Sequence, residues 1–87
     1  MYRIVRSPKI ESVFKKLSKK NPKQMDAIIE KLSQIVENPQ RFKPLHNIMK
    51  GFRRVHFGSF VLTYYIDEEN KKIILEDYDH HDNIYRK

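Results

Sequence analysis

The chain has 87 residues, and its 18 lysines and arginines outnumber 11 aspartates and glutamates, which gives a formal net charge of +7 at pH 7. It has no cysteine, so disulfide bonds and thiolate metal sites are excluded. The length predicts a single domain over residues 1–87, and no segment approaches the roughly 20 apolar residues of a membrane span. We therefore expect a cytoplasmic protein with no membrane contact. The positive charge favours an anionic partner, with nucleic acid as the first candidate, although lysines kept only for solubility would give the same composition.

Two helices are predicted in the N-terminal half, after a short strand at residues 2–6. Ser7 and Asn21 suit the N-caps of these helices, each followed by a proline, and the second helix stops at residues 38–39. So short a link between them predicts an antiparallel helical hairpin. Apolar residues recur at helical spacing and are expected in the core: Ile10, Val13, Phe14, Leu17, Met25, Ile28, Ile29, Leu32, Ile35 and Val36.

The C-terminal half reads as a loop at residues 40–51 followed by three strands. Gly58 and Ser59 form a two-residue turn with glycine at the first central position, as a type II′ turn requires. The element order β-α-α-β-β-β predicts an α+β fold, in which a helical hairpin packs on one face of a small, mainly antiparallel sheet. The three strands are expected at residues 52–57, 60–66 and 72–79.

The two-residue turn also predicts which side chains share a face of the sheet. It pairs Phe57 with Phe60 and so fixes the register of both strands. Counting outward from the turn, Val55 falls on the apolar face against the helices. Arg54 and His56 point to the opposite face, which could form a basic floor.

The register of the last strand is less constrained. A four-residue loop before it predicts that Glu76, Tyr78 and His80 join the face of Arg54 and His56. A slip of one residue would swap the faces.

The closing segment, residues 79–87, carries the most chemical information. His80, His81 and Tyr85 can each carry a proton, and they follow an apolar strand in a basic chain. Imidazole and phenol groups beside a phosphate-binding surface can move protons on that phosphate. Further cations that could bind phosphate are Lys43, Lys50, Arg53 and Arg86.

A metal site is the alternative use of the same histidines. His80 and His81 lie among Asp77, Asp79 and Asp82, and imidazole with carboxylate suits zinc or manganese. Adjacent residues of an extended segment point to opposite sides, however. We therefore expect no metal at this position.

These features together resemble the RelE/ParE superfamily of toxins from type II toxin–antitoxin modules, particularly its RelE branch. The resemblance covers nearly the whole chain. It rests on the order of elements, the Asn38-Pro39 helix stop, residues 45–58, the strand containing Tyr64, and the closing His80-His81-x-x-Ile84-Tyr85.

The resemblance implies a ribosome-dependent endoribonuclease that cuts mRNA without a metal or other cofactor, by attack of the 2′-oxygen on the adjacent phosphate. It also implies a neutralising, RelB-like antitoxin as partner, besides the ribosome and mRNA. In such an enzyme Arg54 would clamp the phosphate, and His56 would be a base or a second phosphate contact. His81 takes a position often held by arginine, with His80 before it, and Tyr85 matches the closing tyrosine, which would shuttle a proton or stack on a base.

Two departures from the family pattern bear on the activity. Val61 stands where many members have arginine, and Lys43 stands where some have a glutamate base. The Val61 departure keeps open a catalytically weak module that binds RNA or an antitoxin. A ParE-like inhibitor of DNA gyrase is a further alternative, although the closing histidines and tyrosine argue against a protein that only binds.

Overall fold

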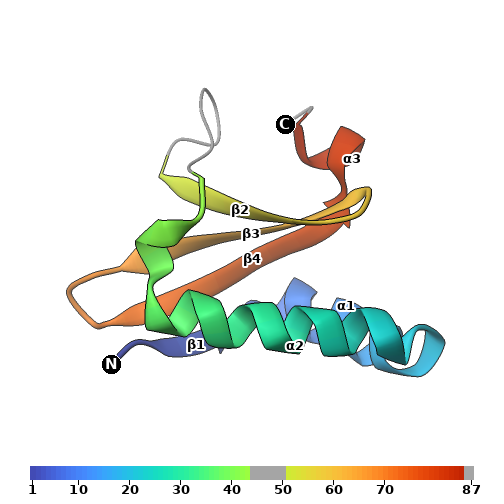
Figure 1. The fold of residues 1–87 in the computed structure, drawn as a ribbon, viewed down its shortest axis with the longest axis horizontal. Helices are drawn as coiled ribbons and strands as arrows, with labels where there is room; N and C mark the ends of the chain where they lie inside the picture. Colours follow the sequence, from blue (N-terminus) through green and yellow to red (C-terminus); the bar gives the residue numbers. More distant parts are fainter. Residues whose placement is uncertain (44–50, 86–87) are drawn as a thin grey trace.

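The computed structural model describes residues 1–43 and 51–85 (Figure 1). The predicted Lys50 and Arg86 sites lie outside these residues. The elements in chain order are β1 (Arg3–Arg6), α1 (Pro8–Lys20), α2 (Pro22–Glu37), the 3-10 turn η1 (Pro39–Arg41), β2 (Phe52–Phe57), β3 (Phe60–Asp67), β4 (Lys72–His80) and α3 (His81–Tyr85).

The four strands form one mixed sheet in the order β1-β4-β3-β2. β1 runs parallel to β4, whereas β2–β3 and β3–β4 are antiparallel. α1 and α2 lie against one face, and the short α3 lies over the opposite face beside the β2–β3 turn (Figure 1). The predicted α+β class, with a helical hairpin on a mainly antiparallel sheet, is therefore confirmed. No helix in residues 1–43 or 51–85 is long and apolar enough to cross a bilayer.

The helices begin where the sequence predicts. The Ser7 hydroxyl accepts a hydrogen bond from the Ile10 N–H, and the Asn21 side chain accepts one from the Gln24 N–H. Each bond satisfies a donor that the first helical turn leaves free. The Gln24 side chain donates to the Tyr78 hydroxyl at 2.7 Å, which ties α2 to the sheet.

The core lies between the helical hairpin and the sheet. A buried aliphatic or aromatic side chain contributes about 1.5–3 kcal/mol, so this layer holds the sheet in place. Tyr64 is fully buried within it, and its hydroxyl donates to the carbonyl of Pro39 at 2.7 Å. The other buried members are Ile10, Phe14, Met25, Ile28, Leu32, Ile35, Val55, Leu62, Ile73, Leu75 and Tyr78.

The β2–β3 hairpin has the predicted register. Phe57 pairs with Phe60, Val55 with Leu62, and Gly58 has φ of 62° at the first central position of the turn. A positive φ there costs glycine little. The side chains of Arg54 and His56 are thereby placed on the face away from α1 and α2.

The predicted faces of β4 are wrong beyond a bulge. Thr63 pairs with Asp77 but Tyr64 pairs with Leu75, so Glu76 is an extra residue in β4. An extra residue reverses the inward and outward alternation of everything after it. Tyr78 consequently faces the helices, where its ring meets Phe14 edge-on at 6.3 Å.

The bulge moves His80 as well. His80 pairs with Phe60, and the two rings meet edge-on with centroids 5.8 Å apart. His80 therefore does not share the face of Arg54 and His56. Asp77 and Asp79 occupy the positions on that face that the sequence assigns to Tyr78 and His80.

Candidate functional site

The helix α3 brings the end of the chain onto the open face of the sheet. Its first backbone N–H, that of His81, donates to the carbonyl of Ser59 in the β2–β3 turn at 2.9 Å. Ile84 is fully buried, as are Val61 and Thr63 on the face that α3 covers. This second, small apolar layer explains why Val61 is compatible with the fold, because a charged side chain here would be buried beneath α3.

The side chains of β2 and α3 meet at this face. The Tyr85 hydroxyl lies 3.2 Å from Nε2 of His56, within hydrogen-bonding distance. The Arg54 guanidinium carbon lies 5.6 Å from the centroid of the Tyr85 ring, a cation–π contact. The His81 ring centroid is 6.5 Å from that of Tyr85. Three of the other four predicted catalytic side chains thus gather around the Tyr85 ring.

This cluster is open to solvent. Tyr85 is 44% exposed, and His56 is exposed. A phosphodiester could therefore approach without a rearrangement of the core. An imidazole, a phenol and a guanidinium within one cluster supply a proton acceptor, a proton donor and a fixed positive charge, which are the groups that phosphodiester chemistry needs.

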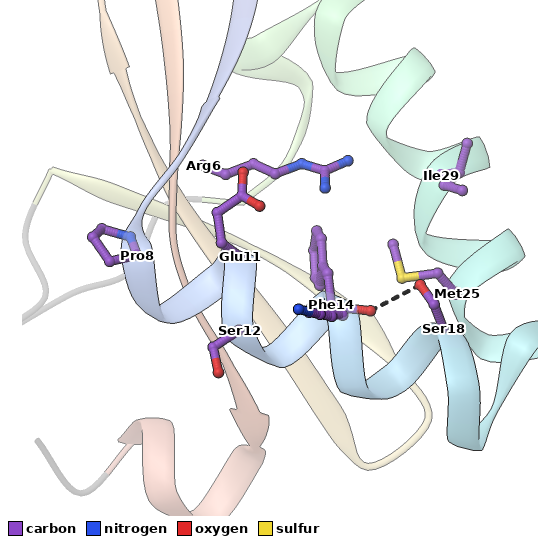
Figure 2. Close-up of a pocket in the computed structure, with 9 residues that line it drawn as sticks. Arg6, Pro8, Glu11, Ser12, Phe14, Ser18, Met25 and Ile29 are labelled. Atoms are coloured by element: carbon purple, nitrogen blue, oxygen red, sulfur yellow. Dashed lines mark hydrogen bonds between the residues drawn. The ribbon is translucent and has the colours of Figure 1, made fainter.

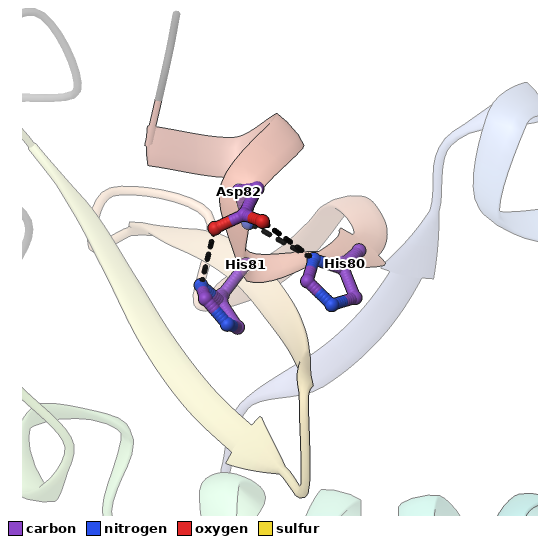
Figure 3. A group of neighbouring side chains, drawn as sticks. All are labelled: His80, His81 and Asp82. Carbon is purple, nitrogen blue, oxygen red and sulfur yellow. Dashed lines mark hydrogen bonds and ion pairs between the residues drawn. The ribbon is translucent and has the colours of Figure 1, made fainter.

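His80 and His81 lie side by side rather than pointing apart (Figure 3). Their rings stack with centroids 4.5 Å apart. The expectation of opposite directions is wrong because β4 ends at His80 and α3 begins at His81, so the backbone turns between them. The Asp82 carboxylate contacts both rings at their Nδ1 edges, with oxygens 3.0 Å from Nδ1 of His81 and 3.6 Å from Nδ1 of His80.

This trio is also the arrangement that a metal ion would use. One ligand atom from each of His80, His81 and Asp82 can be chosen so that all lie within 4.8 Å of one another. Two imidazoles and a carboxylate suit zinc. The predicted absence of a metal stays a prediction.

A basic groove continues from the cluster along the exposed edge of β2. It has a volume of about 390 Å³. Arg54, Val55 and His56 come from β2, and the other lining residues come from α2, η1 and the two residues after η1. These other residues are Lys31, Arg41, Phe42 and Lys43. Sequence reasoning identified Lys43 but missed Lys31, Arg41 and Phe42, since these belong to segments without a shared periodicity.

Arg53, the other predicted phosphate ligand, has structural partners. One of its terminal nitrogens donates to the carbonyls of Phe42 at 2.8 Å and Gln40 at 3.2 Å. These bonds hold η1 against β2. Phosphate binding by Arg53 stays a prediction.

A larger groove, of about 680 Å³, lies on the helical side of the molecule (Figure 2). Arg6 lies over the Phe14 ring there, 5.3 Å from its centroid, and Met25 and Ile29 come from α2. The Ser18 hydroxyl donates to the Phe14 carbonyl at 2.8 Å. Among the described residues that line it, none carries an imidazole or a phenol group.

This fold, a helical hairpin on a four-stranded mixed sheet, is that of the RelE and YoeB toxins. In the RelBE2 toxin–antitoxin complex of Mycobacterium tuberculosis, the matching chain superposes with a TM-score of 0.77 and 25% identity, over 91% of this chain and 96% of that one. In the YoeB–YefM complex of Staphylococcus aureus, the values are 0.78 and 21%, over 93% and 98%. The second likeness, at its lower identity, supports the fold alone.

The comparisons of sequence identify the family more specifically than the comparisons of structure do. Residues 4–85 match the family model described as the ParE toxin of the type II toxin–antitoxin system parDE. The chain belongs to this family and is a toxin of the RelE/ParE superfamily. It is 44% identical to the candidate toxin RelE4 of Methanocaldococcus jannaschii over 88 aligned residues, which span 100% of this chain and 94% of the relative. It is 48% identical over 86 residues to an uncharacterised protein of Methanosarcina mazei, spanning 98% and 100%.

Proposed function

We propose that this toxin is a ribosome-dependent mRNA endoribonuclease. The observation that carries the proposal is the contact between the Tyr85 hydroxyl and Nε2 of His56, 3.2 Å apart, beside the Arg54 guanidinium. A surface that only binds a partner has no need for a phenol and an imidazole within proton-transfer distance. The basic character of the chain, +7 at pH 7, suits an RNA substrate.

In the proposed reaction, the ribose 2′-oxygen forms a bond to the adjacent phosphorus while the bond from phosphorus to the 5′-oxygen breaks. A base accepts the 2′-hydroxyl proton, and an acid supplies a proton to the departing 5′-oxygen. The products are a 2′,3′-cyclic phosphate and a free 5′-hydroxyl. His56 and Tyr85 are placed to share these two proton transfers, and His81 is a second candidate acid. His80, on the far side of His81, would act through that neighbour.

Arg54 would supply the fixed positive charge. Its guanidinium can donate two parallel hydrogen bonds to phosphate oxygens and stabilise the charge that grows in the transition state. No step needs a metal ion or another cofactor.

Two classes of partner follow from this proposal. A cognate, RelB-like antitoxin would neutralise the toxin, as the solved neighbours are toxin–antitoxin complexes. The ribosome would present the mRNA in the cytoplasm. A ParE-like inhibitor of DNA gyrase is the second candidate function, favoured by the ParE description of the matching family.

Inducible expression tests the two candidates in one experiment. The toxin is induced with and without the neighbouring open reading frame, and 5′ ends are mapped on several mRNAs by primer extension. Translation-dependent ends within coding regions, lost in the Arg54→Ala, His81→Ala and Tyr85→Phe variants, support the nuclease. Growth arrest with DNA damage and no new mRNA ends supports the gyrase inhibitor. Full toxicity of all three variants would disprove the site.

A further inference from the structure

We infer that the basic groove along the edge of β2 is a second phosphate subsite, which holds the RNA backbone next to the phosphate that is cut. This inference rests on the proposed nuclease function. Its central residues are Lys31 and Arg41, which lie outside the cluster around Tyr85.

The first observation is that the positive charges in the groove are not neutralised by carboxylates of the described residues. Lys31, Arg41, Lys43 and Arg54 line the groove, and none of the described residues that line it is acidic. Within residues 1–43 and 51–85, none of these four cations forms an ion pair with a carboxylate. Like charges that converge on a concave surface repel one another and attract a polyanion.

The second observation is that the cations are held in place. The Lys31 ammonium lies 5.8 Å, and the Arg41 guanidinium carbon 5.7 Å, from the centroid of the Phe42 ring. Both distances lie within the range of a cation–π contact. Phe42 is itself partly buried against the core, and its carbonyl accepts a hydrogen bond from Arg53 at 2.8 Å. Both cations are therefore positioned at the groove.

The third observation is continuity with the candidate catalytic site. Arg54 and His56 line the groove and also contact Tyr85. An RNA strand whose phosphate reaches Arg54 must leave the site on one side or the other, and this groove offers a basic path over the edge of the sheet. Its volume of about 390 Å³ falls within the roughly 300–1,000 Å³ of ligand sites. Phosphodiester backbone is therefore the occupant that charge, size and position favour, rather than an acidic protein segment.

The experiment measures binding separately from cleavage. Fluorescence anisotropy follows binding of the full-length toxin to a labelled RNA hexamer that carries 2′-O-methyl groups, which prevent attack by the 2′-oxygen. The test variant is Lys31→Ala/Arg41→Ala. The matched control is Lys16→Ala/Lys19→Ala, which removes the same charge from exposed positions of α1 outside the groove.

We expect the groove variant to bind about tenfold more weakly than the control, and the slope of log affinity against log salt to fall by about 0.7, the value for one single-strand phosphate contact. Replacing single phosphates with neutral methylphosphonates then locates the contact. Neutralising the phosphate next to the scissile one should weaken binding to the wild type but not to the groove variant. The swap Lys31→Arg/Arg41→Lys should restore binding, which separates charge from folding.

Equal losses of RNA affinity in the groove variant and in the control would contradict the proposed subsite. Suppose that the wild type cuts mRNA on ribosomes, but that a methylphosphonate at any position lowers the RNA affinity of the wild type and of the groove variant equally. The proposed subsite would then be wrong, while the proposed nuclease function would remain supported. If the wild type binds RNA through the groove but never cuts it, the nuclease is wrong. If the groove variant keeps RNA affinity but loses affinity for the antitoxin, the groove binds an acidic protein segment instead.

Discussion

The hydroxyl of Tyr85 lies 3.2 Å from Nε2 of His56, although 29 positions separate the two residues in the chain. Such a pair can transfer a proton. If it performs the acid or base step of RNA cleavage, Tyr85→Phe should lower the cleavage rate by about 10²–10⁴-fold, since the phenol proton is lost while the ring stays. Ribosome-dependent cleavage of a defined mRNA measures this effect.

The His56→Ala variant provides a test of coupling. Two groups that act as one unit lose their function together, so the double variant should be little slower than either single variant. Thermal unfolding should be unchanged for Tyr85→Phe, because the phenol hydroxyl is on a side chain that is 44% exposed. Losses that multiply in the double variant would show that the two residues act independently.

Ile84 anchors the helix that carries Tyr85, and it is fully buried. Ile84→Ala removes the apolar contact of α3 with the sheet, a change that costs about 2–5 kcal/mol in a packed core. Because α3 is the last described element, we expect it to detach while the rest of the fold remains. Amide exchange of His81, whose N–H bonds to the Ser59 carbonyl, should then become fast, and cleavage should fall as in Tyr85→Phe.

The Ile84→Val variant is the matched control. This variant keeps most of the apolar contact, so the substitution should lower the stability of the α3 contact by only about 0.5–1.5 kcal/mol. Protected exchange at His81 in Ile84→Ala would contradict the anchoring role.

The parts of this fold that local chemistry determines were predictable from the sequence. Ser7 and Asn21 cap helices because their side chains reach a backbone N–H three residues ahead. The turn at Gly58 admits only one register, so the placement of Arg54 and His56 on the open face followed.

The other parts depend on contacts between distant segments. The bulge at Glu76 has no local signature, yet it reversed the predicted faces of Tyr78 and His80. α3 spans five residues, His81–Tyr85, which is too short for a helical period to appear. It forms where Ile84 can be buried, and that burial depends on the finished sheet. The groove lined by Lys31 and Arg41 likewise exists only once η1 has folded against β2.

The predicted chemistry uses no metal, so a zinc-selective chelator that leaves the Mg²⁺ of the ribosome in place should not change the rate of ribosome-dependent cleavage. Zinc added in excess should inhibit if it binds at the closing histidines. His80, His81 and Asp82 offer ligand atoms within 4.8 Å of one another, and a bound ion would occupy the His81 imidazole.

If zinc in excess binds at His80, His81 and Asp82, isothermal titration calorimetry should detect one ion per chain, and Asp82→Asn should weaken both zinc binding and zinc inhibition. A cleavage rate that rises on addition of zinc would contradict the metal-free mechanism. Equal inhibition of the wild type and Asp82→Asn would place the zinc elsewhere.

Tyr64 should make the fold sensitive to alkali. Its phenol is fully buried, and burial raises its pKa to about 12 from the usual 10, partly opposed by the positive charge of Arg53. The folded state therefore holds the proton more tightly than the unfolded state. The resulting stability is complete below pH 10 and is lost as the pH rises from 10 to about 12, a loss of roughly 2–3 kcal/mol at about 1.4 kcal/mol per pKa unit.

Urea unfolding at several pH values between 8 and 12 measures this loss, with Tyr64→Phe as the comparison. At pH 8 the variant should be less stable by about 1 kcal/mol, because the hydrogen bond to the Pro39 carbonyl is missing. The phenylalanine cannot ionise, so the variant should lose less stability as the pH rises, and the two curves should cross at about pH 11, where the wild type has lost about 1 kcal/mol of this stability. All other side chains are the same in both proteins, so their contributions cancel in the difference. Parallel curves across this range would mean that the Tyr64 phenol does not control the alkaline transition.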